Sequence, residues 1–202
     1  IENDIQKAKE QIKALYASDY TQFPPQGIDI NDSFFAEIST KAEKPARLYF
    51  GCMAIGTSPT TMMIRVMTSF LYAARYLAEL GYDEKIIDSF WTITGYFNTL
   101  RELGGAIVRV FDDIQDRFNY LRDTKFKALY PLVNAKKRFV NLKELTSREK
   151  SKDIGKAIQD LKIPYKKDGS TDPFDFLLSS NMISVGVDVG RLGSMVVAGQ
   201  PK

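Results

Sequence analysis

FWTITGYFNTLRELGG, residues 90–105, contains the clearest fold signal in this chain of 202 residues. Its first half is rich in aromatic and β-branched residues, which is typical of a buried strand. Thr99 then stands three residues before Glu102, the spacing of a capping box that begins a helix. Apolar residues continue at three- and four-residue steps as far as Leu121, as in an amphipathic helix. The stretch therefore predicts a strand followed directly by a helix.

The same alternation continues toward the C-terminus. RFVNLKELTS (138–147), PFDFLLSSN (173–181) and SMVVAGQ (194–200) read as strands, and residues 154–161 as a short helix. Strands that alternate with helices in this way favour an α/β fold, a mainly parallel sheet with flanking helices. Ligands of open α/β sheets bind beyond the carboxyl ends of the strands.

Upstream of this region, two more helices and a further strand are expected. Residues 1–17 read as a helix, and ARLYFGCMA (46–54) as a buried strand. Ser58 and Pro59 stand in the order of an N-cap and first helical residue, and an amphipathic helix follows that ends before Gly81.

The expected domain division follows from these elements. Residues 1–45 are predicted to form a helical or irregular linker or docking arm, and residues 46–202 a single lobe. The first residue is Ile1, not methionine, which suggests a piece of a longer protein.

Gly51 and Gly56 stand at the spacing of a Walker A phosphate-binding loop, but Thr57 occupies the position of its lysine. A threonine cannot supply the positive charge that reaches the β and γ phosphates. We therefore interpret these glycines as part of a strand-to-helix junction. A nucleotide-dependent transferase built on this loop remains an alternative, which nucleotide binding by this chain would support.

Composition excludes several classes of protein. The chain has one cysteine and no histidine, which excludes an internal disulfide and the commonest zinc ligand, and no metal site is expected. The longest apolar stretch, residues 62–80, is interrupted by Arg65 and Arg75, so no membrane span is expected. These features favour a cytoplasmic protein.

The net charge of +3 is small, but its distribution is uneven. Between residues 124 and 143 there is no acidic residue, while the basic residues are Lys125, Lys127, Lys136, Lys137, Arg138 and Lys143. This basic run is either a phosphate-facing surface or a solvated loop, and charge alone does not decide between them.

Three segments have the order and character of helicase motifs. DFLLSSNMISVGVDVGRLGSMVVAGQP (175–201) resembles motif V of superfamily 2 helicases, TGYFNTLRELGG (94–105) resembles motif IV, and KELTSRE (143–149) looks like the motif between them. Together they look most like the helicase subunit of DISARM-type anti-phage systems, best over residues 90–202. The resemblance implies a second RecA-like lobe.

The resemblance also implies roles for single residues. A nucleic-acid track would be lined by Asn98, Thr99, Arg101, Thr146, Ser147, Arg148, Ser180 and Asn181. Gly186 and Asp188 would lie toward the nucleotide cleft. Taken singly, each has a structural explanation: Thr99 as a helix cap, Gly186 as a turn residue, and Asp188 as a surface carboxylate.

The segments that this chain lacks limit what it can do alone. A superfamily 2 helicase needs a first lobe with the Walker motifs and a motif VI arginine after the last strand. The resemblance thus implies no catalytic residue here and no cofactor for the chain alone, but ATP and Mg²⁺ in the intact protein. The implied partners are DNA, the first RecA-like lobe of the same protein and further defence-system subunits. A non-catalytic nucleic-acid-binding or assembly module is the alternative.

Overall fold

The computed structural model describes residues 2–18, 21, 23–24, 29, 33–35, 47–125, 139–146, 151–180 and 189–199. The chain divides into two compact units, Ile1–Gly51 and Cys52–Lys202. The first unit contains α1 (Glu2–Tyr16), which confirms the predicted N-terminal helix. Its rings of Phe23 and Phe34 pack edge to face with centroids 4.8 Å apart, and those of Phe34 and Phe35 do so at 5.0 Å.

The second unit is built on a four-stranded parallel sheet, with strand order β2-β3-β1-β4. The strands are β1 (Ile93–Phe97), β2 (Leu142–Leu145), β3 (Phe176–Ser179) and β4 (Ser194–Ala198). Each lies inside a segment predicted from the sequence to be a strand. The α/β fold with a parallel sheet and flanking helices is therefore confirmed.

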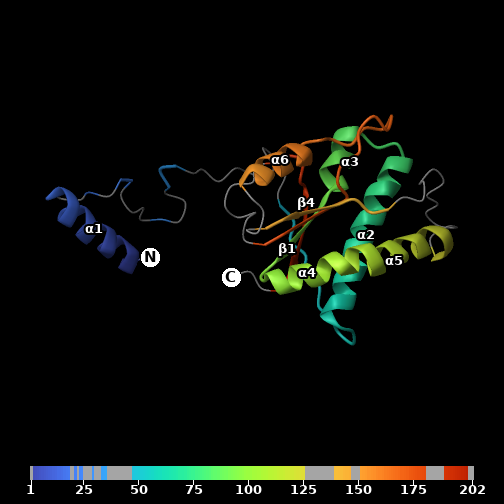
Figure 1. Cartoon of the computed structure of the whole chain (residues 1–202), viewed down its shortest axis with the longest axis horizontal. Coiled ribbons are helices and arrows are strands. Elements are labelled where there is room, and N and C mark those ends of the chain that lie inside the picture. Colours follow the sequence, from blue (N-terminus) through green and yellow to red (C-terminus); the bar gives the residue numbers. More distant parts are fainter. Residues whose placement is uncertain are drawn as a thin grey trace. The chain divides into compact units, whose positions relative to one another are not determined.

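Helices cover both faces of this sheet (Figure 1). They are α2 (Pro59–Glu79), α3 (Glu84–Trp91), α4 (Leu100–Arg109), α5 (Gln115–Tyr120) and α6 (Ser151–Leu161), with the π-helical segments η1 (Val110–Ile114) and η2 (Leu121–Lys125). The predicted helix from residue 100 to Leu121 is one helical run made of α4, η1, α5 and η2. Figure 1 shows α6 and the α4–α5 run on opposite sides of the sheet.

The alternation of side chains along β3 explains why both faces are covered. Phe176 and Leu178 belong to a core that includes Met67 of α2 and Leu103 of α4. Leu177, between them, belongs to a second core with residues of α6. Because successive strand residues point to opposite faces, a strand that is buried on both faces is apolar throughout.

Helix α2 begins where the sequence predicts. The Ser58 hydroxyl oxygen accepts a hydrogen bond from the Thr61 backbone N–H at 3.1 Å, and Pro59 is the first helical residue. Gly81 has a φ of +78°, the left-handed conformation that commonly ends a helix. Ser58 is thus the cap of a helix, as predicted, but residues 47–57 contain no strand, so the helix start is confirmed and the strand-to-helix junction is not.

The predicted strand at residues 46–54 is wrong. Residues 47–54 form neither a helix nor a strand, and the side chains of Leu48, Tyr49 and Phe50 are 73–80% exposed. Apolar and aromatic residues favour a strand only where a neighbouring strand supplies hydrogen bonds and packing. Composition alone could not show that this neighbour is missing among the described residues.

Helix α3 was not predicted. Phe90 and Trp91 were assigned to the start of a strand, but they form the last turn of this eight-residue helix. The helix starts at Asp83, whose carboxylate accepts a hydrogen bond from the Lys85 N–H at 2.8 Å. A helix this short shows too few turns of apolar spacing to be distinguished from the strand that follows it.

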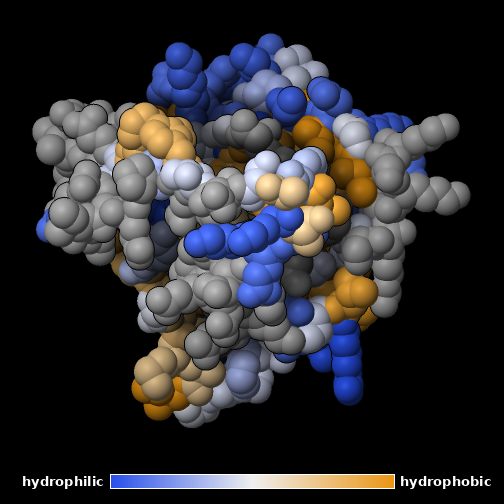
Figure 2. Space-filling view, turned by 90° about the vertical axis from the view of Figure 1, so that its left-hand side faces the viewer, coloured by the Kyte–Doolittle hydropathy of each residue, from blue (hydrophilic) through white to orange (hydrophobic). Residues whose placement is uncertain are grey.

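Some large apolar side chains lie on the surface. Figure 2 shows orange, hydrophobic patches and blue, hydrophilic residues on the face that it views. None of the described helices is both long enough and apolar enough to cross a membrane.

Gly193 allows a close contact between the start of β4 and α3. Its N–H donates to the Ser89 carbonyl oxygen at 2.8 Å, and a Cβ at this position would lie 2.5 Å from the same oxygen. We expect Gly193→Ala to lower the free energy of unfolding in urea by about 1–3 kcal/mol, because backbone atoms must move apart.

Gly155→Ala is the matched control for this prediction. Gly155 is exposed on α6, and nothing lies within 4 Å of a Cβ built there. Alanine should stabilise this helix by about 0.5–1 kcal/mol. Equal unfolding midpoints for Gly193→Ala and the unchanged protein would contradict the prediction that this close contact requires glycine.

Candidate functional site

The candidate site is the edge of the sheet where the four parallel strands end. The strands are followed at this edge by Asn98 after β1, Thr146 after β2, Ser180 after β3 and Gly199 after β4. The register pairs Leu145 with Ser179, and Phe97 with Ala198, so these ends are level with one another. We call this region the carboxyl edge.

The described residues that follow β1 and β3 in the chain pack on opposite faces of the sheet. After β1 the chain enters α4, whose Leu103 packs in the core with Met67. After β3 the chain reaches Val189, which packs in the other core with Leu177. In open α/β sheets such a point, where adjacent connections separate, is the usual place for a bound ligand. The carboxyl edge between β1 and β3 therefore has the topology of a ligand site.

Thr99 caps α4 at this edge, as the sequence predicts. Its backbone is extended, with φ −133° and ψ 150°, and its hydroxyl oxygen accepts a hydrogen bond from the Glu102 N–H at 3.2 Å. A hydroxyl that accepts in this way still has its own hydrogen to donate. Thr99 and Arg101 are both exposed, and Asn98 is half-buried. These three predicted residues are brought together in one short segment.

Thr146 and Ser180 lie at the same edge but are buried. The Thr146 hydroxyl donates to a Glu144 carboxylate oxygen at 3.1 Å. Between their strands, the buried Ser179 hydroxyl lies 2.8 Å from the Leu145 carbonyl oxygen and 3.0 Å from that of Ser180. Ser179 thus connects the ends of β2 and β3, a contact that the sequence analysis did not identify.

Several predicted site residues lie outside the described part of the chain. They are Ser147 and Arg148 after β2, and Asn181, Gly186 and Asp188 after β3. Most of the basic run also lies outside it, and within it the Lys143 side chain is half-buried on β2. Their predicted roles remain predictions.

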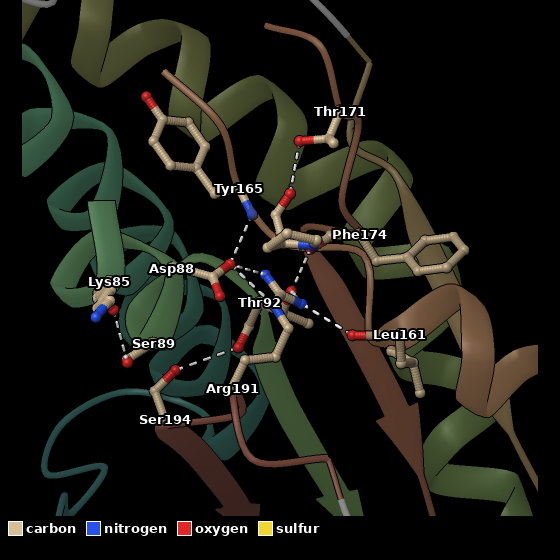
Figure 3. Close-up of polar contacts among 11 residues, drawn as sticks. Lys85, Asp88, Ser89, Thr92, Leu161, Tyr165, Thr171, Phe174, Arg191 and Ser194 are labelled. Atoms are coloured by element: carbon tan, nitrogen blue, oxygen red, sulfur yellow. Dashed lines mark hydrogen bonds and ion pairs between the residues drawn. The ribbon is translucent and has the colours of Figure 1, made fainter. Parts of the chain in front are cut away.

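A largely buried ion pair that the sequence does not predict lies at the opposite, amino edge of the sheet (Figure 3). The Arg191 Nε and Nη2 atoms donate to Asp88 Oδ1 at 2.9 and 2.7 Å, and its Nη1 donates to the Thr92 hydroxyl at 2.9 Å. The same Nη1 reaches the Leu161 carbonyl oxygen at 3.2 Å. One side chain thereby connects α3, the residue that precedes β1 and the end of α6 to the turn before β4. No motif marks a pair 103 residues apart.

A second cluster lies at the same amino edge. Arg75 forms an ion pair with the buried Asp175 just before β3. Its guanidinium also lies 3.9 Å from the centre of the Trp91 ring, on which Tyr165 stacks at 4.2 Å. Burial, with a smaller effect of Glu84, raises the pKa of the Tyr165 hydroxyl above its ordinary value. The charged and aromatic side chains at the amino edge therefore serve to hold the fold together.

Metal ligands are not grouped anywhere in the described ranges. No three histidine, cysteine, aspartate or glutamate residues there are placed to hold one ion.

Comparison with known proteins relates the chain to a protein of an anti-phage defence system by name. The chain is 40% identical over 200 residues to the DISARM protein DrmA of Bacillus paralicheniformis. The alignment covers 98% of this chain but 17% of that protein's length. No family model matches the chain. The similarity relates the chain to a DISARM protein, and it concerns a small part of a much longer polypeptide.

The largely buried ion pair between Arg191 and Asp88 gives a stability prediction. The side chains of Arg191 and Asp88 are only 9% and 16% exposed, so Arg191→Met leaves an aspartate charge buried without its partner. We expect the free energy of unfolding to fall by about 3 kcal/mol, measured by urea or thermal unfolding.

Arg109→Met is the control, since Arg109 pairs with Asp113 on the surface of the same fold and both are at least 40% exposed. Surface pairs of this kind contribute about 0.5 kcal/mol or less. Similar losses for the two variants would show that the Arg191 pair has no special importance.

Proposed function

We propose that the chain is the second RecA-like lobe of an ATP-dependent superfamily 2 DNA helicase or translocase that acts in bacterial anti-phage defence. Its part in that protein would be to supply the nucleic-acid track and one side of the ATP cleft. The single observation that supports this most strongly is the position of Asn98, Thr99 and Arg101. They follow the strand that lies between β3 and β4, at the carboxyl edge, where the motif IV resemblance requires a nucleic-acid contact.

The sequence comparison and the topology add support. The similarity to DrmA extends over nearly the whole chain, which fits the motif resemblance to the helicase subunit of DISARM-type systems. The sheet β2-β3-β1-β4, with helices on both faces, is also compatible with a RecA-like lobe. On this proposal the chain belongs to a defence system with further subunits, and the first lobe is another part of the same protein.

The chemistry of the segment from Asn98 to Arg101 suits a phosphate backbone. An exposed arginine attracts phosphate, and the Thr99 hydroxyl and the backbone N–H groups of the first helical turn can donate to phosphate oxygens. None of these donors reads a base edge, so binding would not depend on sequence. Thr146 and Ser180 are buried at the same edge, and their contribution would be to hold the strand ends in place.

Binding and hydrolysis of ATP would need residues that are not found in the described part of this chain. Ser58 is used as a helix cap, and Thr57 stands in place of the Walker lysine. We therefore assign no step of hydrolysis to this chain. In the longer protein, the Walker motifs of the first lobe would bind ATP with Mg²⁺, while Gly186 and Asp188 would face the same cleft.

The test is the affinity of the chain for labelled single-stranded DNA, measured by fluorescence anisotropy at about 50 and about 200 mM salt. We expect salt-sensitive binding that does not depend on base sequence. Arg101→Ala should weaken DNA binding. It should also make the plot of log association constant against log salt less steep by about 0.7, the contribution of one phosphate contact on a single strand. Arg148→Ala should do the same if its predicted role is correct.

Arg109→Ala removes the same charge from the same helix two turns further on, and it should leave the slope nearly unchanged. Equal effects of the two substitutions would place the contact elsewhere on the surface. Absence of binding by the unchanged chain at either salt concentration would contradict the proposed track. Intact binding without DNA-stimulated ATP hydrolysis by the longer protein would favour the non-catalytic module.

A further inference from the structure

Gly199 lies beside Asn98 at the carboxyl edge. The register of β1 and β4 pairs Phe97 with Ala198, so Asn98 and Gly199 are the next residues on the two neighbouring strands. A Cβ built on Gly199 would lie 3.3 Å from the Asn98 side-chain nitrogen, Nδ2. This separation is shorter than an ordinary van der Waals contact, so the Asn98 amide would have to shift by a few tenths of an ångström to admit a side chain at position 199.

The backbone at Gly199 is also unusual. Its φ of +84° lies in the left-handed region, where most L-residues are strained and glycine is not. Two separate features therefore favour glycine here. The positive φ concerns only the turn after β4. The lack of room for a Cβ concerns Asn98, a residue of the proposed nucleic-acid track.

The position of the Asn98 side chain would affect how it binds a phosphate. It is half-buried and comes directly before Thr99, the cap of α4. Its side-chain amide has two N–H donors, which suit phosphate oxygens. A small displacement of this amide changes the donor geometry while leaving the strand and helix on either side intact.

We propose that Gly199 is a positioning residue for the nucleic-acid track, because its missing side chain keeps the Asn98 amide where it can donate to a phosphate. This inference rests on the proposed function. It adds a residue of β4's end to a track that the sequence motifs place only after β1, β2 and β3. If Gly199 served the turn alone, its replacement would affect stability and not DNA binding.

The experiment separates the two features with glycine variants of the full chain, each tested for thermal unfolding and for single-stranded DNA binding. Gly199→Asn introduces a Cβ, but asparagine tolerates a positive φ better than most residues. Gly199→Ala introduces the same Cβ together with backbone strain. Gly81→Ala is the matched control, because Gly81 has a φ of +78° and nothing within 4 Å of a built Cβ.

We expect both Gly199 variants to bind DNA about tenfold more weakly, the effect of one lost hydrogen bond to a charged group. Gly81→Ala should unfold at a lower temperature and bind DNA as the unchanged chain does. A double variant, Asn98→Ala with Gly199→Asn, should bind no more weakly than Asn98→Ala alone, because both changes act on the same contact.

Unchanged affinity for Gly199→Asn would overturn the inference, and so would losses that add in the double variant. If Arg101→Ala still weakened binding in that case, the proposed function would stand without this role for Gly199. If the unchanged chain did not bind DNA, the proposed function would fail and the inference with it.

Discussion

The parallel pairing of β1 with both β3 and β4 is the constraint on which the rest of the second unit depends. Parallel strands cannot be joined by tight turns, so each connection has to return across a face of the sheet. This places the α4–η2 run and α6 on opposite faces and buries β3 on both. It also brings every strand end to one edge, although the residues that follow the strands are far apart in the sequence.

The two edges of the sheet differ in their chemistry. At the amino edge, Arg191 and Arg75 are bound to aspartates and are largely buried, which fixes the turn before β4 and the start of β3. At the carboxyl edge, Thr99 and Arg101 are exposed on the first turn of a helix. Rigid contacts at one edge would allow polar groups at the other to meet a ligand in a fixed arrangement.

Local patterns in the sequence were sufficient for much of the fold. The apolar spacing of α2, the Ser58 cap and the four strands were predicted because each signal lies within about twenty residues. The segment at residues 46–54 was assigned wrongly, since its composition favours a strand whatever its surroundings. At the site, the cap at Thr99 could be predicted. The burial of Thr146 and Ser180 and the position of Gly199 beside Asn98 depend on strand order. The ion pair of Asp88 and Arg191 could not be predicted either, because the two residues are 103 positions apart in the sequence and meet only in the folded sheet.

Hydrogen exchange of the chain with and without single-stranded DNA tests the central claim most directly, because it locates the contact without a substitution. If DNA binds at the carboxyl edge, exchange should slow for the backbone amides of residues 98–103. The loop of residues 162–174 at the amino edge should exchange as before. Slower exchange confined to that loop, or found nowhere in the presence of saturating DNA, would contradict the account.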